Sequence, residues 1–313
     1  MKKNIIATTL CLLAFSSTAA QKKVMIIGMD GTAPRAVAWG IQNNVLPEYA
    51  NLSQKGFITY KITSVLGSNE KHNTWSSANW TSLLTGVQPI RHGIWNNDLD
   101  NINAIDSDFK GYKKDIAPPV MIDMKNSGLE TSSYIAWQPV EQAFGRYFTH
   151  RFTVKDDYDE PVVNKVVEDL PTTKSDFIFV HLVGVDDAGH CHGYGINTPA
   201  YMEALKNSDK EIGNIISVLK NRKTIKDEDW LILITADHGG ARNSTFHGDG
   251  NSPEIFDSFL IGAQLNKGEW QKINVSIPDG HSVDLTSLTP TYMNFLGVKS
   301  NIKYDSTPVN LHN

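Results

Sequence analysis

Short apolar runs alternate with amphipathic stretches along this chain. Runs of four to seven apolar residues are typical of buried strands. Four runs of this kind stand out: Val24–Gly28, Phe177–Val183, Trp230–Ile234 and Phe259–Gly262. Apolar residues at helical spacing predict helices in other stretches, namely 46–56, 76–86, 198–222 and 285–296. Apolar strands separated by helices favour an α/β fold with a mainly parallel central sheet flanked by helices on both faces.

The first twenty residues follow the pattern of a signal peptide. A basic start, Met1–Lys3, precedes an apolar run, Ile5–Phe15, and a small polar segment, Ser16–Ala20. We expect cleavage after Ala20 and export to the periplasm or medium. The apolar run is too short for a stable bilayer span, although an uncleaved anchor is the alternative. Since no later stretch approaches eighteen apolar residues, no membrane span is predicted.

The remaining residues, 21–313, are predicted to form a single catalytic domain. The stretch from 98 to 174 is less regular, so it is the place where a small lid or insertion is expected. Its aromatic residues could stack on a base or belong to the core: Trp137, Phe144, Tyr147, Phe148 and Phe152.

Charge and cysteine content narrow the class of protein. The formal net charge is −5 and the isoelectric point is about 6.0. Because binding to nucleic-acid duplexes needs a basic surface, we do not expect it here. Of the two cysteines, Cys11 lies in the predicted signal peptide, so Cys191 has no internal partner. The core, together with any bound metal, must therefore stabilise the fold.

Acidic residues follow three of the apolar runs, where ligands bind in open α/β sheets. These are Asp30, Asp186 and Asp237. Each alone suits a turn or a helix cap, but three in the same position are harder to explain in that way. Histidines accompany them at His190, His238 and His247. This mixture of oxygen and nitrogen ligands suits zinc, and also manganese or iron.

Five motifs in order resemble the alkaline phosphatase superfamily, and most closely its type I phosphodiesterase/nucleotide pyrophosphatase branch. The resemblance extends from Val24 to Gly297. The motifs are Ile27–Gly31; Thr74–Gly86 followed by Pro89 and His92–Ile94; Asp186–His190; Thr235–Gly239; and His247–Gly248 ahead of Phe259–Gly262. Any one motif is weak alone, but their order and their places after the predicted strands make the signal strong.

The resemblance implies two divalent metal ions, zinc or alternatively manganese, and an alkaline phosphatase-like fold. One site would comprise Asp30, Asp237, His238 and the Ser76 oxygen. The other would comprise Asp186, His190 and His247, with His281 as the rival for the third position. His92 is expected to pack in a turn, and His150, His181 and His192 to be structural or exposed.

Ser76 matches the family's nucleophile. Thr74 and Ser77 carry the competing hydroxyls, and the alternative role for Ser76 is that of a helix cap. Metal coordination would lower the pKa of its hydroxyl and lead to a covalent intermediate that water hydrolyses. Asn97, twenty-one residues later, matches an amide that contacts a phosphoryl oxygen. The neighbouring Asn96 is the alternative residue for this contact. A simple turn would also explain the presence of two asparagines here.

The resemblance implies an exported phosphodiesterase or nucleotide pyrophosphatase whose substrate is a small phosphate ester, such as a nucleotide. A neutral amide at Asn97 suits a diester with one charge. The alternatives are an alkaline phosphatase-like phosphomonoesterase, a sulfatase-like hydrolase and a non-catalytic binding module with the same fold. Against a standard sulfatase, Ser76 is followed by Ala78 and Trp80 where proline and arginine would be expected.

Overall fold

The structure is a computed structural model that describes residues 19–67, 71–98, 107–155, 158–247, 252–277 and 281–312. Most of the predicted signal peptide, together with Gly248 of the fifth motif, lies outside these residues. Among the described helices, none is long and apolar enough to cross a membrane.

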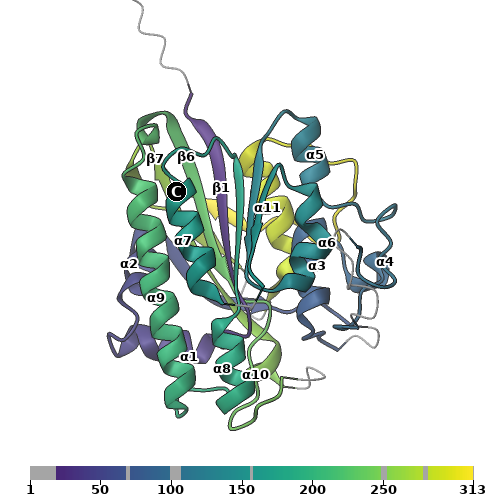
Figure 1. Ribbon diagram of the computed structural model, residues 1–313, viewed down its shortest axis with the longest axis vertical. Coiled ribbons are helices and arrows are strands. Elements are labelled where there is room, and N and C mark those ends of the chain that lie inside the picture. The colour runs from purple at the N-terminus through teal and green to yellow at the C-terminus, as the bar shows by residue number, and fades with distance from the viewer. Residues whose placement is uncertain are drawn as a thin grey trace, which may run out of the picture.

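The described residues form a central nine-stranded sheet and a separate two-stranded sheet (Figure 1). The central sheet has the order β10-β2-β7-β6-β1-β5-β3-β4, with β8 beside β7. Its strands are β1 (Gln21–Met29), β2 (Phe57–Thr63), β3 (Thr131–Ile135), β4 (His150–Thr153), β5 (Phe177–Leu182), β6 (Glu228–Thr235), β7 (Asp257–Asn266), β8 (Glu269–Gln271) and β10 (Val283–Asp284). The small sheet pairs β9 (Asn274–Ser276) with β11 (Asn310–His312).

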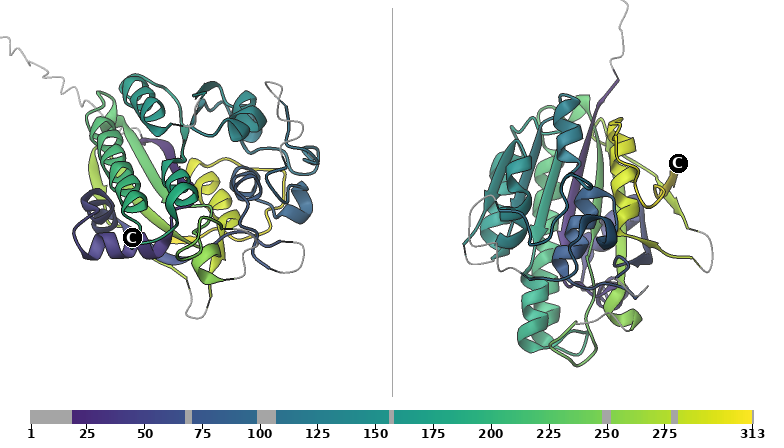
Figure 2. Two further views of the ribbon diagram at one scale, coloured as in Figure 1. Left: turned by 60° about the horizontal axis from the view of Figure 1, so that its bottom comes forward. Right: turned by 90° about the vertical axis from the view of Figure 1, so that its right-hand side faces the viewer.

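Helices cover both faces of the sheet (Figures 1 and 2). On one face lie α1 (Pro34–Gln42), α2 (Pro47–Lys55), α7 (Asp159–Asp169) and α9 (Pro199–Lys220). On the other lie α3 (Ser76–Thr85), α5 (Met121–Asn126), α6 (Gln138–Phe144) and α11 (Leu288–Leu296). The shorter helices are α4 (Pro89–His92), α8 (Gly184–His192) and α10 (Pro253–Phe256), with 3₁₀ turns at Gly145–Tyr147, Ile225–Asp227 and Leu285–Ser287.

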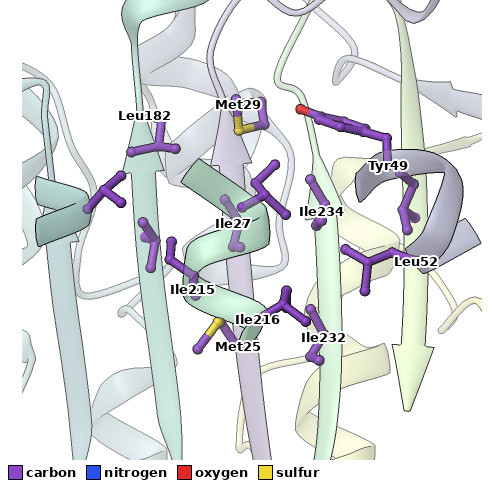
Figure 3. Packing of buried hydrophobic residues seen from close by; sticks show 14 of the residues in the cluster. Met25, Ile27, Met29, Tyr49, Leu52, Leu182, Ile215, Ile216, Ile232 and Ile234 are labelled. Carbon is purple, nitrogen blue, oxygen red and sulfur yellow. The ribbon is translucent and has the colours of Figure 1, made fainter. Parts of the chain in front are cut away.

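Strand β1 shows why the sheet needs two helical layers. Its side chains alternate between the faces, as in any strand. Met25 and Ile27 pack in the core with α2 and α9 (Figure 3), whereas Val24 and Ile26 belong to the core on the α3 and α11 side. Both sets are fully buried. This two-sided burial explains the continuous apolar runs and confirms the predicted α/β fold with a mainly parallel sheet.

Strand β7 departs from the parallel pattern. It pairs antiparallel with β6 on one side and β2 on the other. The reason lies in the connection from β6, which contains only the four-residue α10 among its described residues and no long crossover helix. A parallel return would require such a crossover. The antiparallel turn brings the start of β7 to the carboxyl edge of β6.

The stretch where a lid or insertion was expected contributes largely to the main sheet. Its described residues include β3 and β4 and the covering helices α5, α6 and α7. Phe144 and Phe148 are buried in the core, and Phe148 stacks on Phe177 of β5. Trp137, Tyr147 and Phe152 are partly buried against the two cores.

Candidate active site

The candidate site lies at the edge of the sheet where β1, β5 and β6 end. These three strands are parallel neighbours, with β1 in the middle. Asp30 follows β1 directly, and Asp237 comes two residues after β6. Asp186 lies one turn further on, inside α8, so that His190 is four residues away on the same face of that helix. Parallel strand ends therefore bring together residues that are distant in sequence.

The first group of candidate ligands contains Asp30, Asp237 and His238. One ligand atom of each lies within 4.8 Å of the others, and all three side chains are buried. The His238 Nε2 atom is 3.5 Å from Asp30 Oδ1 and 3.4 Å from Asp237 Oδ2. The Ser76 Oγ atom joins this group, 3.2 Å from Asp30 Oδ1 and 3.3 Å from His238 Nε2.

The second group contains Asp186, His247 and, again, His238, with ligand atoms within the same limit of 4.8 Å. The His238 and His247 rings stack with centroids 3.9 Å apart. His190 lies beside this group: its Nε2 is 3.3 Å from Asp186 Oδ2, and its ring centroid is 4.9 Å from that of His247. The sequence assigned His238 to the first site alone, whereas the geometry places it between both. His281, the rival of His247, is exposed and outside both groups.

Ser76 is the first residue of α3. Its hydroxyl is hydrogen-bonded to Asp30 and His238. Of the competing hydroxyls, Thr74 Oγ1 donates to the His247 carbonyl at 3.4 Å, and Ser77 Oγ is buried without a hydrogen bond. The start of a helix favours negative charge, so this position suits an ionised serine oxygen.

Asn97 is held next to Ser76 by the backbone of the adjoining residue. Its Oδ1 accepts a hydrogen bond from Ser77 N at 2.9 Å. Asn96 is exposed, and its Oδ1 accepts from Asp98 N at 3.0 Å, which makes a local turn. The structure thus brings Asn97 next to Ser76 and leaves Asn96 in the surface turn.

Charges at the site are poorly balanced by the protein itself. Burial raises the pKa of Asp30, but hydrogen bonding and charge from His181 and His238 outweigh it and hold that pKa below its usual range. For Asp237, burial and repulsion from Asp30 and Asp186 raise the pKa well above the usual value. Among the described residues, neither lysine nor arginine forms an ion pair with these three aspartates.

Backbone carbonyls orient His238 and His190 so that Nε2 of each faces a carboxylate of the site. The Nδ1 atoms of His238 and His190 face the carbonyls of Gly239 and Thr245, at 2.7 and 2.9 Å, so each donates there. His238 Nε2 is then the ring atom that faces the carboxylates of Asp30 and Asp237. Burial, followed by the charge of His238, lowers the pKa of His247 to about 3 and keeps that ring neutral.

His190 pairs with Asp186, with its Nε2 3.3 Å from Asp186 Oδ2. Its hydrogen bond to Asp186 raises its pKa to about 9, so a proton occupies Nε2. Elsewhere in the cluster, Asp237 Oδ2 and His247 Nδ1 are buried without a hydrogen bond. Buried acceptors of this kind, beside uncompensated carboxylates, fit divalent ions with oxygen and nitrogen ligands. The residues present therefore fit the expected metals.

Asp30 has two partners that the sequence did not reveal. Its Oδ2 accepts hydrogen bonds from Trp80 Nε1 at 2.9 Å and from His181 Nε2 at 3.1 Å. His181, expected to be structural or exposed, is fully buried in β5 and pairs in register with Gly28 of β1. In the sequence, the signal for this contact was a histidine inside an otherwise apolar strand. By contrast, His92 is bonded to Ser82 and to the backbone of Ile94 away from the site, and His150 and His192 are exposed.

Two adjoining Asp/His groups and a serine at a helix start thus lie together at the carboxyl edge of the sheet. Residues 24–299 match the family described as type I phosphodiesterase/nucleotide pyrophosphatase. The chain belongs to this family.

Similar proteins agree with the family and the fold. Human ectonucleotide pyrophosphatase/phosphodiesterase family member 5 is 26% identical over 249 residues, which is 75% of this chain and 48% of that protein. This chain thus spans about half the length of that curated relative. The mouse protein of the same name, solved as an inactive variant with AMP, is 15% identical with a TM-score of 0.65, covering 92% of this chain and 97% of that one. A 2-O GAG sulfatase gives a TM-score of 0.66 at 14% identity, covering 92% and 73%.

Proposed function

We propose that this protein is an exported, metal-dependent phosphodiesterase that acts through Ser76. The observation that carries the proposal is the position of the Ser76 hydroxyl, within 3.3 Å of both Asp30 and His238 at the start of α3. No other hydroxyl described near the site, neither Thr74 nor Ser77, has this environment. The candidate ligands are Asp30, Ser76, Asp237 and His238 for one ion, and Asp186, His190 and His247 for the other.

The bound ions, zinc or alternatively manganese, would lower the pKa of nearby hydroxyl groups and stabilise the developing negative charge. Asp30 and His238 hold Ser76 Oγ in place, and the start of α3 favours its anionic form. Oγ loses its proton to solvent and forms a bond to phosphorus while the bond to the leaving oxygen breaks, and that oxygen takes a proton from solvent. Water then attacks the Ser76 phosphoester and restores the hydroxyl.

The expected substrate is a diester or pyrophosphate with one charge on the reacting phosphorus. Asn97 Oδ1 is occupied by Ser77 N, so Nδ2 is the end available to donate to a phosphoryl oxygen. A neutral donor suits a monoanion, whereas a monoesterase more often uses arginine or lysine. The AMP bound to the mouse relative favours a nucleotide as the small-molecule ligand.

A panel of esters tests this proposal. Purified protein is assayed with bis(4-nitrophenyl) phosphate, 4-nitrophenyl phosphate and 4-nitrophenyl sulfate, first with a chelator and then with added zinc or manganese. We expect hydrolysis of the diester above the other two, lost with the chelator and restored by metal. Preference for the monoester or sulfate would favour the phosphomonoesterase or sulfatase-like alternative, and activity on none would favour a binding module.

Export has its own test. Cleavage after Ala20 predicts that the protein recovered from the periplasm or medium begins at Gln21, as N-terminal sequencing would show. An intact Met1 on cell-associated protein would contradict it.

A further inference from the structure

Tyr194 is a fully buried residue beside Asp186, His190 and His247, the proposed ligands of the second ion. It lies just after α8, between Gly193 and Gly195, whose φ angles are +100° and +131°. Such angles are rarely adopted by other residues, so the chain makes a turn here that depends on glycine. This turn directs the Tyr194 ring back toward the helix that carries Asp186 and His190.

The ring and hydroxyl of Tyr194 contact the three residues proposed as ligands of the second ion, Asp186, His190 and His247. The hydroxyl donates to Asp186 Oδ1 at 2.6 Å, while Asp186 Oδ2 faces His190. The ring meets the His190 and His247 rings edge-on, with centroids 5.7 and 6.1 Å apart. A phenol donates at neutral pH, so the bond fixes which Asp186 oxygen remains for other partners.

Tyr194 also joins two loops that are distant in sequence. A Cβ atom added at Gly189 or at Gly240 would collide with its ring, so both glycines leave room for it. Its backbone N–H donates to Ser244 O at 2.9 Å, and it forms a bridge with Arg242. The loop after β6, which carries His238 and His247, is thereby tied to α8.

We propose that Tyr194 is the positioning residue of the second metal site: it fixes the carboxylate of Asp186 and holds α8 against the loop that carries His247. The inference rests on the proposed metal-dependent function. Residues that orient metal ligands through a second hydrogen bond affect metal affinity about 10–100-fold. Removal of the Tyr194 hydroxyl should therefore weaken the binding of one ion and leave the binding of the other unchanged.

Two substitutions separate the hydroxyl from the ring. Tyr194→Phe removes only the hydrogen bond to Asp186. Gly240→Ala keeps the Tyr194 hydroxyl, but its added Cβ atom displaces the Tyr194 ring. The matched control is Tyr134→Phe, which removes a similar Tyr–Asp bond, from Tyr134 OH to Asp169 at 3.1 Å, in β3 away from the site.

Zinc content and affinity are measured in each protein by mass spectrometry and calorimetry, with thermal unfolding alongside. We expect wild type and Tyr134→Phe to bind two ions, and Tyr194→Phe and Gly240→Ala to bind one ion normally and the other about 10–100-fold more weakly. A general structural role would instead lower the melting temperature without this split between the sites.

Two ions bound with wild-type affinities by Tyr194→Phe and Gly240→Ala would overturn the inference. A wild type that binds two ions but hydrolyses no ester would overturn the proposed function and leave the role of Tyr194 standing. A wild type that binds neither zinc nor manganese would overturn both.

Discussion

At the scale of single residues, the site depends on which atom of each side chain is left free. The Nδ1 atoms of His238 and His190 donate hydrogen bonds to backbone carbonyls. Asp30 Oδ2 accepts hydrogen bonds from Trp80 and His181. The sequence identified the chemical types, because carboxylates and imidazoles after strands are recognisable. It did not identify Asp30's partner His181, since that contact depends on the register between β1 and β5.

His181 should support metal binding through Asp30. His181→Leu removes one of the two side-chain donors to Asp30 Oδ2, and we expect metal affinity at the first site to fall about 10–100-fold. His92→Leu is the control, because His92 is also buried and hydrogen-bonded but lies away from the cluster. It should lower thermal stability and leave zinc affinity unchanged. Equal zinc affinities for His181→Leu and wild type would reject this role.

Asn97 should act on the reacting phosphate. Loss of one donor to a developing negative charge costs about 100-fold or more in turnover, so we expect Asn97→Ala to reduce kcat on a phosphodiester by about that factor. Asn96→Ala, in the adjacent exposed turn, should retain near-normal turnover. Steady-state kinetics of both proteins provide the comparison. If the two variants were equally active, Asn97 would be no more than a turn residue.

At the scale of elements, the sequence predicted buried strands well and strand direction less well. Runs such as Trp230–Ile234 are apolar throughout because both faces of β6 are covered. The same kind of run at Phe259–Gly262 became an antiparallel strand. Its direction was set by the connection, with the short α10 in place of a crossover helix. Residue patterns report burial, whereas direction depends on how the connecting chain folds.

The start of α2 offers a test of how elements are joined. Its N-cap residue, Leu46, makes no side-chain cap, and Asp209 of α9 instead accepts from the N–H groups of Glu48 and Tyr49, at 3.0 and 2.9 Å. Loss of a helix cap costs about 0.5–2 kcal/mol. We therefore expect Asp209→Ala to reduce the free energy of unfolding by about that amount in denaturant titrations. Asn207→Ala, exposed on the same helix, should have little effect. Equal stabilities would show that this cap is unimportant.

At the scale of the whole molecule, one half-buried acid on the α7–α9 side should make stability depend on pH. Burial, followed by repulsion from Asp159 and Glu160, raises the pKa of Glu211 from 4.5 to about 8. Between these values the folded protein keeps a proton that the unfolded chain releases. The contribution of Glu211 is therefore complete below pH 4.5 and is lost as the pH rises through about 8.

Replacing this acid should remove that dependence. We expect Glu211→Gln to be more stable than wild type near pH 8, with the difference vanishing toward pH 4.5. Melting temperatures across this range provide the measurement. Glu203→Gln is the control, because Glu203 is exposed on the same helix. A constant difference between Glu211→Gln and wild type at every pH would contradict the assignment.

The whole site is assembled only when four chain segments meet. Ser76 on α3, Asp30 after β1, Asp186 on α8 and Asp237 after β6 become neighbours because three parallel strands end at one edge and α3 begins beside them. The sequence could anticipate this edge, because parallel strands share it. It could not anticipate that His238 lies between both ligand groups, since that depends on the loop after β6.

The most direct test of the account is turnover of a metal-loaded Ser76→Ala protein on bis(4-nitrophenyl) phosphate, beside Ser77→Ala. Both serines are buried at the start of α3, but only Ser76 contacts Asp30 and His238. With folding and metal content matched to wild type, the account predicts loss of nearly all turnover in Ser76→Ala and near-normal turnover in Ser77→Ala. Wild-type turnover by Ser76→Ala would contradict it.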